Sequence, residues 1–154
     1  MFPRKIVLTA GLLLAFWLAG AGPSLAANGS AFISQSVPTT MAPGQVSTVS
    51  VTMQNTGTTT WTEAGGYKLG TQNPQDNTLW TGFTRIYLSS GDSVAPGQQK
   101  TFTFNITAPS APGSYNFQWR MVHEGVEWFG AFSTNVVIQV TSATTDDAQF
   151  VSQS

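Results

Sequence analysis

The acidic side chains around residues 123–127 are the ones whose spacing could support catalysis. Glu124 and Glu127 flank Gly125, so a hairpin turn at this point would bring two carboxylates toward each other. Two carboxylates held at a defined separation across a cleft are what a glycoside hydrolase needs. His123 adjoins them, but it is the single His of a chain without Cys, which leaves too few ligands for a zinc site. Because charged residues at turns are usually solvated, we predict no catalytic residue, no metal site and no cofactor, and therefore a protein that is not an enzyme.

A polar loop, GTQNPQDNTLWTGF at residues 70–83, holds further candidates. It places Asn73, Asp76 and Asn77 close in sequence to Trp80. Oxygen-rich side chains can bind Ca²⁺, although a single carboxylate makes a weak site. Amides beside an aromatic ring can instead form a binding platform, with the ring giving area and the amides giving direction. The interpretation that we favour is an ordered connection whose amides bond the loop backbone, because polar loops are the ordinary way in which strands connect.

Four tryptophans follow residue 26, and their surroundings divide them into two pairs. Trp119 lies on the apolar side of an alternating stretch and Trp61 follows an Asn-Thr-Gly turn, so both are expected in the core. Trp80 and Trp128 are expected to be exposed. A large exposed ring on a polar surface often marks a recognition site, and Tyr67 could add a third ring. A sugar-binding role for these rings requires at least two of them to be exposed and roughly coplanar.

Alternation of apolar and polar residues predicts the elements that carry these side chains. It is clearest in four stretches, VSVTM at 49–53, QKTFTFNIT at 99–107, SYNFQWRM at 114–121 and NVVIQV at 135–140. A period of two indicates strands with one buried face, and the turn sequence Ala-Pro-Gly occurs three times between them. About seven short strands of this kind predict an all-β fold, an immunoglobulin-like antiparallel β-sandwich. The aromatic core is expected to consist of Trp61, Phe102, Phe104, Tyr115, Phe117 and Trp119.

The first 26 residues have the pattern of a secretory signal peptide. Arg4 and Lys5 precede an apolar run over residues 6–18, and Ser24-Leu25-Ala26 offers small residues for cleavage after Ala26. A retained membrane anchor is the alternative, but a spanning helix needs about 20 apolar residues and this run is shorter. We therefore expect a secreted, periplasmic or cell-surface protein that contacts the membrane only if this segment stays uncleaved.

The charge balance after residue 26 argues against nucleic acid as a partner. Arg4 and Lys5 belong to the leader, so four basic side chains face seven acidic ones and the net charge is −3. A nucleic-acid-binding domain would show a basic stripe, which this sequence lacks. The absence of Cys from an expected exported domain favours a bacterial origin, because many eukaryotic secreted modules carry disulfides.

Several short motifs together resemble a known family. They are NTGTTTW at 55–61, APG at 95–97, APSAPGSY at 108–115, WRM at 119–121 and FG at 129–130. In this order they resemble the four-tryptophan (FW) domain, an immunoglobulin-like sandwich named from the central domain of a eukaryotic autophagy cargo receptor. The resemblance covers roughly residues 31–141, and the stretches YKLGTQNPQDN at 67–77 and WFG at 128–130 look like the bacterial exported branch of the family.

The resemblance implies the fold and a non-catalytic recognition role. Val51 and the region of Leu69 and Gly70 stand where the eukaryotic domain has tryptophans, while Trp80 and Trp128 restore the count of four elsewhere. Cargo selection does not transfer, because an exported chain never meets cytosolic cargo. Function belongs to sites rather than folds, so we predict a recognition or spacer module of an exported, multi-domain bacterial protein. The alternative is a carbohydrate-binding module, and the partner is accordingly a protein or a cell-surface polysaccharide.

A repeated five-residue word suggests how the chain is organised beyond one domain. FISQS at 32–36 recurs as FVSQS at 150–154, after a polar stretch TSATTDD at 141–147. The shift of 118 residues is of the order of one immunoglobulin-like domain plus a linker. We therefore predict a signal peptide at 1–26, one domain at 27–141, and a linker at 142–154 that includes the possible start of a second repeat.

Overall fold

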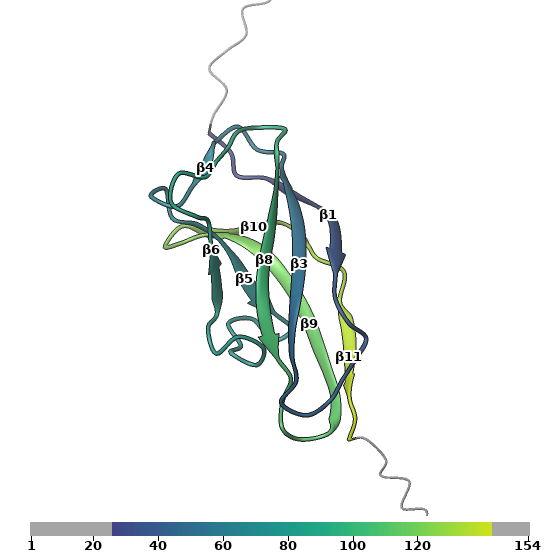
Figure 1. Cartoon of the computed structure of the whole chain (residues 1–154). Helices are drawn as coiled ribbons and strands as arrows, with labels where there is room; N and C mark the ends of the chain where they lie inside the picture. Colours follow the sequence, from purple (N-terminus) through teal and green to yellow (C-terminus); the bar gives the residue numbers. More distant parts are fainter. Residues whose placement is uncertain (1–25, 143–154) are drawn as a thin grey trace, which may run out of the picture.

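The computed structural model describes residues 26–142, which contain strands and turns and no helix (Figure 1). The predicted second repeat at residues 150–154 and the predicted leader, apart from its last residue, lie outside the described residues. The strands are β1 (Ser30–Ser36), β2 (Thr40–Met41), β3 (Val46–Asn55), β4 (Trp61–Thr62), β5 (Tyr67–Gln72), β6 (Arg85–Tyr87), β7 (Ser93–Val94), β8 (Gln99–Thr107), β9 (Gly113–His123), β10 (Glu127–Phe132) and β11 (Val136–Val140). Within the described part, no helix is long and apolar enough to cross a membrane.

These strands form two main layers. One sheet has the order β1-β3-β8, and the other has the order β2-β11-β9-β5-β6, with β10 also paired to β9. All pairs are antiparallel except β2 with β11, which run parallel over Thr40 and Met41. The sandwich is elongated, and the described chain begins at one end of the long axis and finishes at the other (Figure 1). The all-β antiparallel sandwich expected from the sequence is confirmed.

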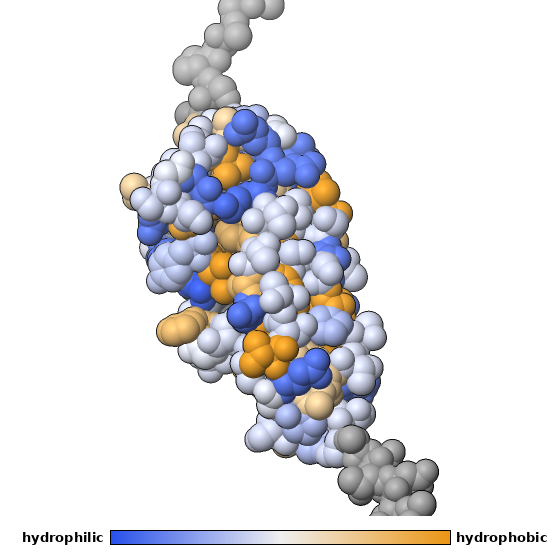
Figure 2. All heavy atoms as spheres, in the orientation of Figure 1, coloured by the Kyte–Doolittle hydropathy of each residue, from blue (hydrophilic) through white to orange (hydrophobic). Residues whose placement is uncertain are grey.

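The period-two pattern accounts for the core between the layers. In β3 the side chains of Val49, Val51 and Met53 are buried, and in β9 so are Phe117 and Trp119. Successive side chains of a strand point to opposite faces, so each sheet presents one apolar face to the other. The face shown in Figure 2 is mostly pale or blue, with hydrophobic side chains in small separate groups. The sheets therefore hold together mainly through apolar burial between them.

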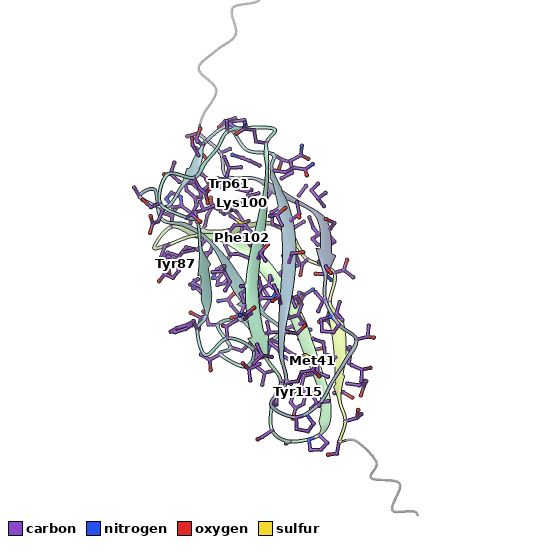
Figure 3. All side chains as sticks on the ribbon, viewed as in Figure 1. Met41, Trp61, Tyr87, Lys100, Phe102 and Tyr115 are labelled. Atoms are coloured by element: carbon purple, nitrogen blue, oxygen red, sulfur yellow. The ribbon has the colours of Figure 1, made fainter. Side chains whose placement is uncertain are left out.

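Aromatic side chains fill both ends of this core. At one end Trp61 packs on Phe129 with ring centroids 5.9 Å apart, and at the other Trp80 packs on Tyr115 at 6.3 Å. Phe104 bridges the middle, 4.9 Å from the ring of Trp119. The six side chains expected in the aromatic core all lie in or against it: Trp61, Phe102, Phe117 and Trp119 are buried, while Phe104 and Tyr115 are partly buried and pack on the cluster (Figure 3).

The structure contains more strand segments than the seven or so expected. Four segments, β2, β4, β6 and β7, have only two or three residues, too few for a sequence period to show. The long strand β9 also has two successive partners along one edge, because β10 pairs with its residues 120–123 and β11 with its residues 113–117. An irregular register between Phe129 and Phe132 separates them, and Gly130 supplies the positive φ found there.

The Asn-Thr-Gly turn after β3 is organised by a buried amide. Asn55 is fully buried, and its side-chain nitrogen donates to the carbonyls of Thr59 at 2.7 Å and Val94 at 2.8 Å. Its side-chain oxygen accepts from the backbone N–H of Gly57 at 3.0 Å. One side chain thus ties the end of β3 to its own turn and to β7, which places Trp61 beneath the turn.

Candidate recognition surface

Charged and aromatic side chains gather on the outer face of the sheet formed by β6, β5, β9 and β10. Leu69 and Met121 point into the core, so their neighbours on the same strands, among them Gly70 and Arg120, point outward. The strand register determines which of these residues are neighbours: Gly70 of β5 lies opposite Arg85 of β6 and opposite Arg120 of β9. We call this surface the Arg85 face, and its outward residues are Lys68, Gly70, Arg85, Tyr87, Arg120, Val122, Trp128 and Phe132.

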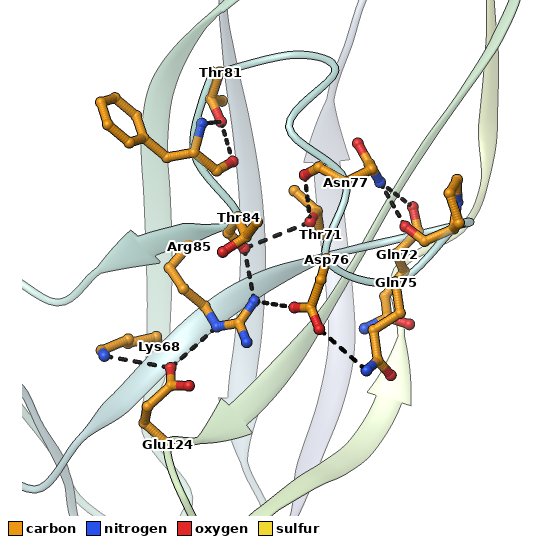
Figure 4. A network of polar contacts seen from close by, with 12 residues as sticks. Lys68, Thr71, Gln72, Gln75, Asp76, Asn77, Thr81, Thr84, Arg85 and Glu124 are labelled. Carbon is orange, nitrogen blue, oxygen red and sulfur yellow. Dashed lines mark hydrogen bonds and ion pairs between the residues drawn. The ribbon is translucent and has the colours of Figure 1, made fainter.

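Arg85 is held by two carboxylates (Figure 4). Its Nε donates to Oε2 of Glu124 at 3.1 Å, and its Nη1 donates to Oδ1 of Asp76 and to the carbonyl of Thr84, the latter at 3.0 Å. Lys68 Nζ shares the same Glu124 oxygen at 3.3 Å. The guanidinium is largely covered while both carboxylates remain partly exposed, so the network anchors β6 to β5 and to the β9–β10 turn.

These contacts shift the ionisation of their members. Hydrogen bonding from Arg85 holds the pKa of the Glu124 carboxyl below its ordinary value, against an opposing effect of partial burial, and Lys68 adds to the lowering. Burial by itself would lower the pKa of Arg85, but the bonds to Asp76 and Glu124 outweigh it and raise that pKa. Each of these two shifts favours the charged form, so Arg85 and Glu124 are both ionised near neutral pH.

Trp128 lies over this network. Its ring is half-buried and reaches across β9 to Gly70 of β5, where a Cβ atom would overlap the ring edge. The guanidinium carbon of Arg85 lies 4.7 Å from the ring centroid. Val122, the cross-strand neighbour of Trp128, is buried although it points to the outer face. Gly70 thus leaves the space in which an indole can cover the outer surface of the sheet.

Two further cation–aromatic contacts extend the Arg85 face. Lys68 Nζ lies 4.8 Å from the ring centroid of Tyr87, and the guanidinium carbon of Arg120 lies 4.6 Å from that of Phe132. Arg120 also donates from Nε to the carbonyl of Gly130 at 3.0 Å. Each such contact contributes roughly 0.5–1 kcal/mol at an exposed site. These contacts place a cation against each of the three aromatic rings on the face.

Two shallow hollows adjoin Arg85. One, of about 300 Å³, is lined by Thr78, Gly82, Phe83, Thr84, Arg85 and Tyr87. The other, of about 210 Å³, lies against Arg85, Trp128 and the turn at residues 122–127. Phe83 and Tyr87 at the first hollow are the most exposed aromatic side chains described, at 72% and 59%. The chemistry on offer is aromatic faces, hydroxyls and paired charges.

The tryptophan and tyrosine candidates do not form the expected platform. The expectation of an exposed Trp80 is wrong: it is 2% exposed, and its Nε1 donates to the carbonyl of Asn116 at 2.8 Å. Tyr67 is also buried, with its hydroxyl bonded to Asn28 and Thr59. Trp80 folds inward because the loop that carries it closes the end of the sandwich against Tyr115 and Phe117. Only Trp128 of the three lies on the outer face.

The polar loop candidates are drawn into their own loop. The Asn77 side-chain nitrogen donates to the carbonyls of Gln72 at 3.0 Å and Pro74 at 2.6 Å, as the ordered-connection interpretation requires. Asn73 and Asp76 adopt positive φ, and Asp76 turns its carboxylate to Arg85. Asp76 therefore joins the Arg85 face, while Asn73 and Asn77 shape the loop beside it. Among residues 26–142, no group of three or more His, Asp or Glu side chains is placed to hold a metal ion.

The two glutamates of the β9–β10 turn have separate partners. Glu124 bonds Arg85 and Lys68, whereas Glu127 accepts from the Asn28 amide at 2.8 Å. His123 stacks on Tyr67 with ring centroids 4.4 Å apart and contacts the same Asn28 amide at 3.2 Å. These groups therefore tie the turn to its neighbours, which is a structural role.

Sequence reasoning missed the residues that define the surface. Arg85 and Tyr87 stand two apart in the strand Arg85–Tyr87, so alternation places both on one face, but three residues are too few to recognise as a strand. Phe83 follows Gly82, which has a positive φ, and such a turn exposes the side chain beside it. The sequence signal that could have identified this surface was an aromatic residue, Phe83, directly after a turn glycine, Gly82.

With the fold and this surface described, comparison with known families is informative. Residues 36–141 match the sequence model of a family described as the Ig-like domain from next to BRCA1 gene, and the match spans more than half of the chain. The chain belongs to this family. A search of the curated proteins finds no match.

Membership in this immunoglobulin-like family confirms the immunoglobulin-like class of the sandwich. It is also consistent with a module that performs no chemistry of its own, in line with the separate partnerships of Glu124 and Glu127. The matched range begins at Ser36, the last residue of β1, and runs past β11, so it includes the whole Arg85 face.

Proposed function

We propose that the protein is a non-catalytic recognition and spacer module of an exported, multi-domain bacterial protein, of the four-tryptophan type, and that it binds its partner through the Arg85 face. One observation supports this most: the described cation–aromatic contacts, Lys68 with Tyr87, Arg85 with Trp128 and Arg120 with Phe132, all lie on that one sheet face. Aromatic and arginine side chains concentrated on one surface are typical of binding sites.

The spacer part of the proposal is supported by the shape of the domain. The described chain begins and finishes at opposite ends of the long axis, so successive copies would join end to end without doubling back (Figure 1). The word FISQS occupies most of β1 and recurs as FVSQS at residues 150–154. A second copy opening at Phe150 is the arrangement that we propose.

Export can be tested through the N-terminus of the mature protein. Arg4, Lys5 and the apolar run before Ala26 support cleavage after Ala26. When the full chain is produced in a bacterium, the exported protein should have the mass of a chain that starts at Ala27. Recovery of the uncleaved chain in the membrane fraction alone would contradict export by cleavage.

Recognition can be tested with envelope preparations of the bacterium in which the protein naturally occurs. The labelled mature protein should bind them, and the double variant Phe83→Ala/Tyr87→Ala should bind at least about tenfold more weakly, as loss of two binding-site rings implies. Val137→Ala on β11 is the matched control, because Val137 is exposed but lies off the Arg85 face. Equal binding by all three proteins would exclude recognition through this face.

A further inference from the structure

We propose that the hollow between Phe83 and Tyr87 binds a neutral polysaccharide. The inference rests on the proposed recognition function and names the ligand class for its surface. Sugar binding by Trp80 and Tyr67 is ruled out because their rings are buried. The rings of Phe83 and Tyr87 take that role instead, because they line one hollow and are exposed to solvent.

The aromatic rings supply the apolar half of the site. Phe83 and Tyr87 both line the 300 Å³ hollow, and neither ring belongs to the core. A pyranose ring has a face of C–H groups that packs well on an aromatic face, whose π-system attracts polarised hydrogens. Tyr87 points away from the body of the sandwich in Figure 3, and Lys68 holds its ring at 4.8 Å, so the ring is positioned before a ligand arrives.

The polar half of the site is made of groups with unused hydrogen-bonding capacity. Thr78 and Thr84 line the same hollow, and among residues 26–142 neither of their side-chain hydroxyls forms a hydrogen bond. A hydroxyl can both donate and accept, which matches the hydroxyls of a sugar. The Asp76 carboxylate, bonded to Arg85 and still 45% exposed, adds an acceptor beside them.

The charges favour a neutral ligand over a charged one. Around the hollow the cations Arg85 and Lys68 are matched by the anions Asp76 and Glu124, through contacts that are already formed. At this hollow, an acidic peptide, an acidic polysaccharide or a nucleic acid would meet cations that are already paired, and binding it there would require breaking these pairs. A neutral polyol can bond to the exposed edges of the paired carboxylates without disturbing them.

The arrangement around Arg85 favours a chain of sugars over a single one. Arg85 lines both hollows, so the two hollows adjoin. A ligand that fills the first can therefore extend into the second, where Trp128 lies. Both hollows are shallow, which suits an extended polymer lying on the sheet surface. An extended peptide is the competing occupant, and the experiment below is designed to separate the two.

The test is a titration of the mature protein with soluble neutral hexasaccharides of β-1,4-glucose, β-1,4-mannose, β-1,4-xylose and α-1,4-glucose, followed by amide chemical shifts. At least one should bind and shift the resonances of Phe83, Thr84 and Tyr87. Phe83→Ala and Tyr87→Ala should each weaken it at least about tenfold, equivalent to about 1.4 kcal/mol. Tyr87→Phe should retain most of the affinity because the ring is kept.

Val137→Ala is again the matched control, because Val137 is 46% exposed, lies on β11 away from the Arg85 face and lines neither hollow. Its affinity should equal that of the unaltered protein. The inference is overturned if no neutral hexasaccharide binds, if a charged polymer such as polygalacturonate binds more tightly, or if Val137→Ala weakens binding as much as Tyr87→Ala.

Failure of this inference is distinguishable from failure of the proposed function. One outcome would separate the two: Phe83→Ala/Tyr87→Ala reduces envelope binding, but soluble neutral hexasaccharides do not compete with that binding. If protease treatment of the envelopes also abolishes envelope binding, the partner is a protein. The recognition function then stands and the polysaccharide inference is wrong. If the double variant leaves envelope binding unchanged, both are wrong.

Discussion

At the scale of single residues, Asn55 shows why a polar side chain can occupy the core. Its amide is completely buried, yet the nitrogen donates to two carbonyls and the oxygen accepts from Gly57. Its backbone also bonds Gln98 and Gly97 of the facing turn at 2.9 and 2.7 Å. Burying a polar group is tolerable only when its bonds are made, so this position accepts few other residues.

We expect Asn55→Ala to lower the free energy of unfolding by about 2–4 kcal/mol, because two buried carbonyls lose their donor. Asn55→Asp should cost at least as much, since it removes the donor and adds a buried carboxylate. Urea denaturation followed by tryptophan fluorescence measures both. Asn105→Ala, on the exposed side of β8, is the control and should change stability by less than about 0.5 kcal/mol. A similar loss in both proteins would contradict the role assigned to Asn55.

Trp119 is buried, and its indole N–H has no hydrogen-bond partner among residues 26–142. We expect Trp119→Ala to cost about 3–5 kcal/mol through the cavity that it leaves. Trp119→Phe should cost no more than about half of that, because it keeps most of the ring and removes an unsatisfied donor. Thermal and urea unfolding compare the two. Equal losses would show that the N–H has a partner, and a loss below about 1 kcal/mol for Trp119→Ala would show that the ring is not part of the core.

Residue burial was predictable from the sequence only where a period exists. Trp119 lies in an eleven-residue strand whose alternation decides its side, and Trp61 follows a recognisable turn. Trp80 lies in a connection without any period, so its direction depends on how the loop closes over Tyr115 and Phe117. That closure is a tertiary event, and the single-sequence pattern carries no trace of it.

At the scale of elements, β5 and β10 fit each other across β9 through a glycine and an indole. Gly70→Ala places a methyl group where the edge of the Trp128 ring lies. We expect the ring to be displaced, with a loss of about 1–3 kcal/mol typical of overpacking and a shift in the tryptophan fluorescence maximum. The double variant Gly70→Ala/Trp128→Ala should be more stable than Trp128→Ala alone, although less stable than the unaltered protein. If the two substitutions are simply additive, the close fit is absent.

The strand β6 is attached to the sheet through the charge network of Arg85, so its attachment should depend on pH. The pKa of Glu124 is lowered in the folded state, chiefly by its bond to Arg85, so its contribution is complete above the ordinary pKa of about 4.5. It is lost as the pH falls through the lower folded-state value. Because the pair is partly exposed, the contribution is of the order of 0.2–1 kcal/mol.

Thermal unfolding between pH 7 and pH 2.5 should therefore show the unaltered protein more stable than Glu124→Gln at neutral pH, with the difference shrinking below about pH 4.5. Glu63→Gln is the control, because Glu63 is exposed and forms no ion pair among residues 26–142. A difference that is constant over the whole range would mean that Glu124 does not act through its charge.

Element types were predictable more widely than element limits. The four alternating stretches and the turn after His123 appear in the structure as β3, β8, β9, β11 and the β9–β10 hairpin. The successive pairing of β10 and β11 with one edge of β9 was not predictable, because it depends on a register shift and on the positive φ of Gly130. The Arg85 face was missed for another reason: β6, which carries Arg85 and Tyr87, has only three residues and shows no period in the sequence.

At the scale of the whole molecule, three segments distant in sequence close one end of the sandwich. Residues 27–29 lie against the turn that follows Asn55, with the Ala27 N–H donating to the Thr58 hydroxyl at 2.8 Å and the Thr56 N–H to the Gly29 carbonyl at 3.0 Å. Asn28 then bonds Glu127 of the β9–β10 hairpin at 2.8 Å. The fold therefore begins within a few residues of Ala26, after which we propose that the chain is cleaved.

The opposite end of the sandwich has a mechanical consequence. The parallel pair of β2 and β11 is bonded from the Gln139 N–H to the Thr39 carbonyl at 2.9 Å and from the Thr141 N–H to the Met41 carbonyl at 3.0 Å. Tension applied along the long axis would pull β11 lengthwise past β2, so these bonds would have to break together instead of one after another. Forced unfolding is governed by the rate of crossing such a barrier. In the tandem arrangement proposed above, such a domain would carry mechanical load between its binding partner and the neighbouring copy.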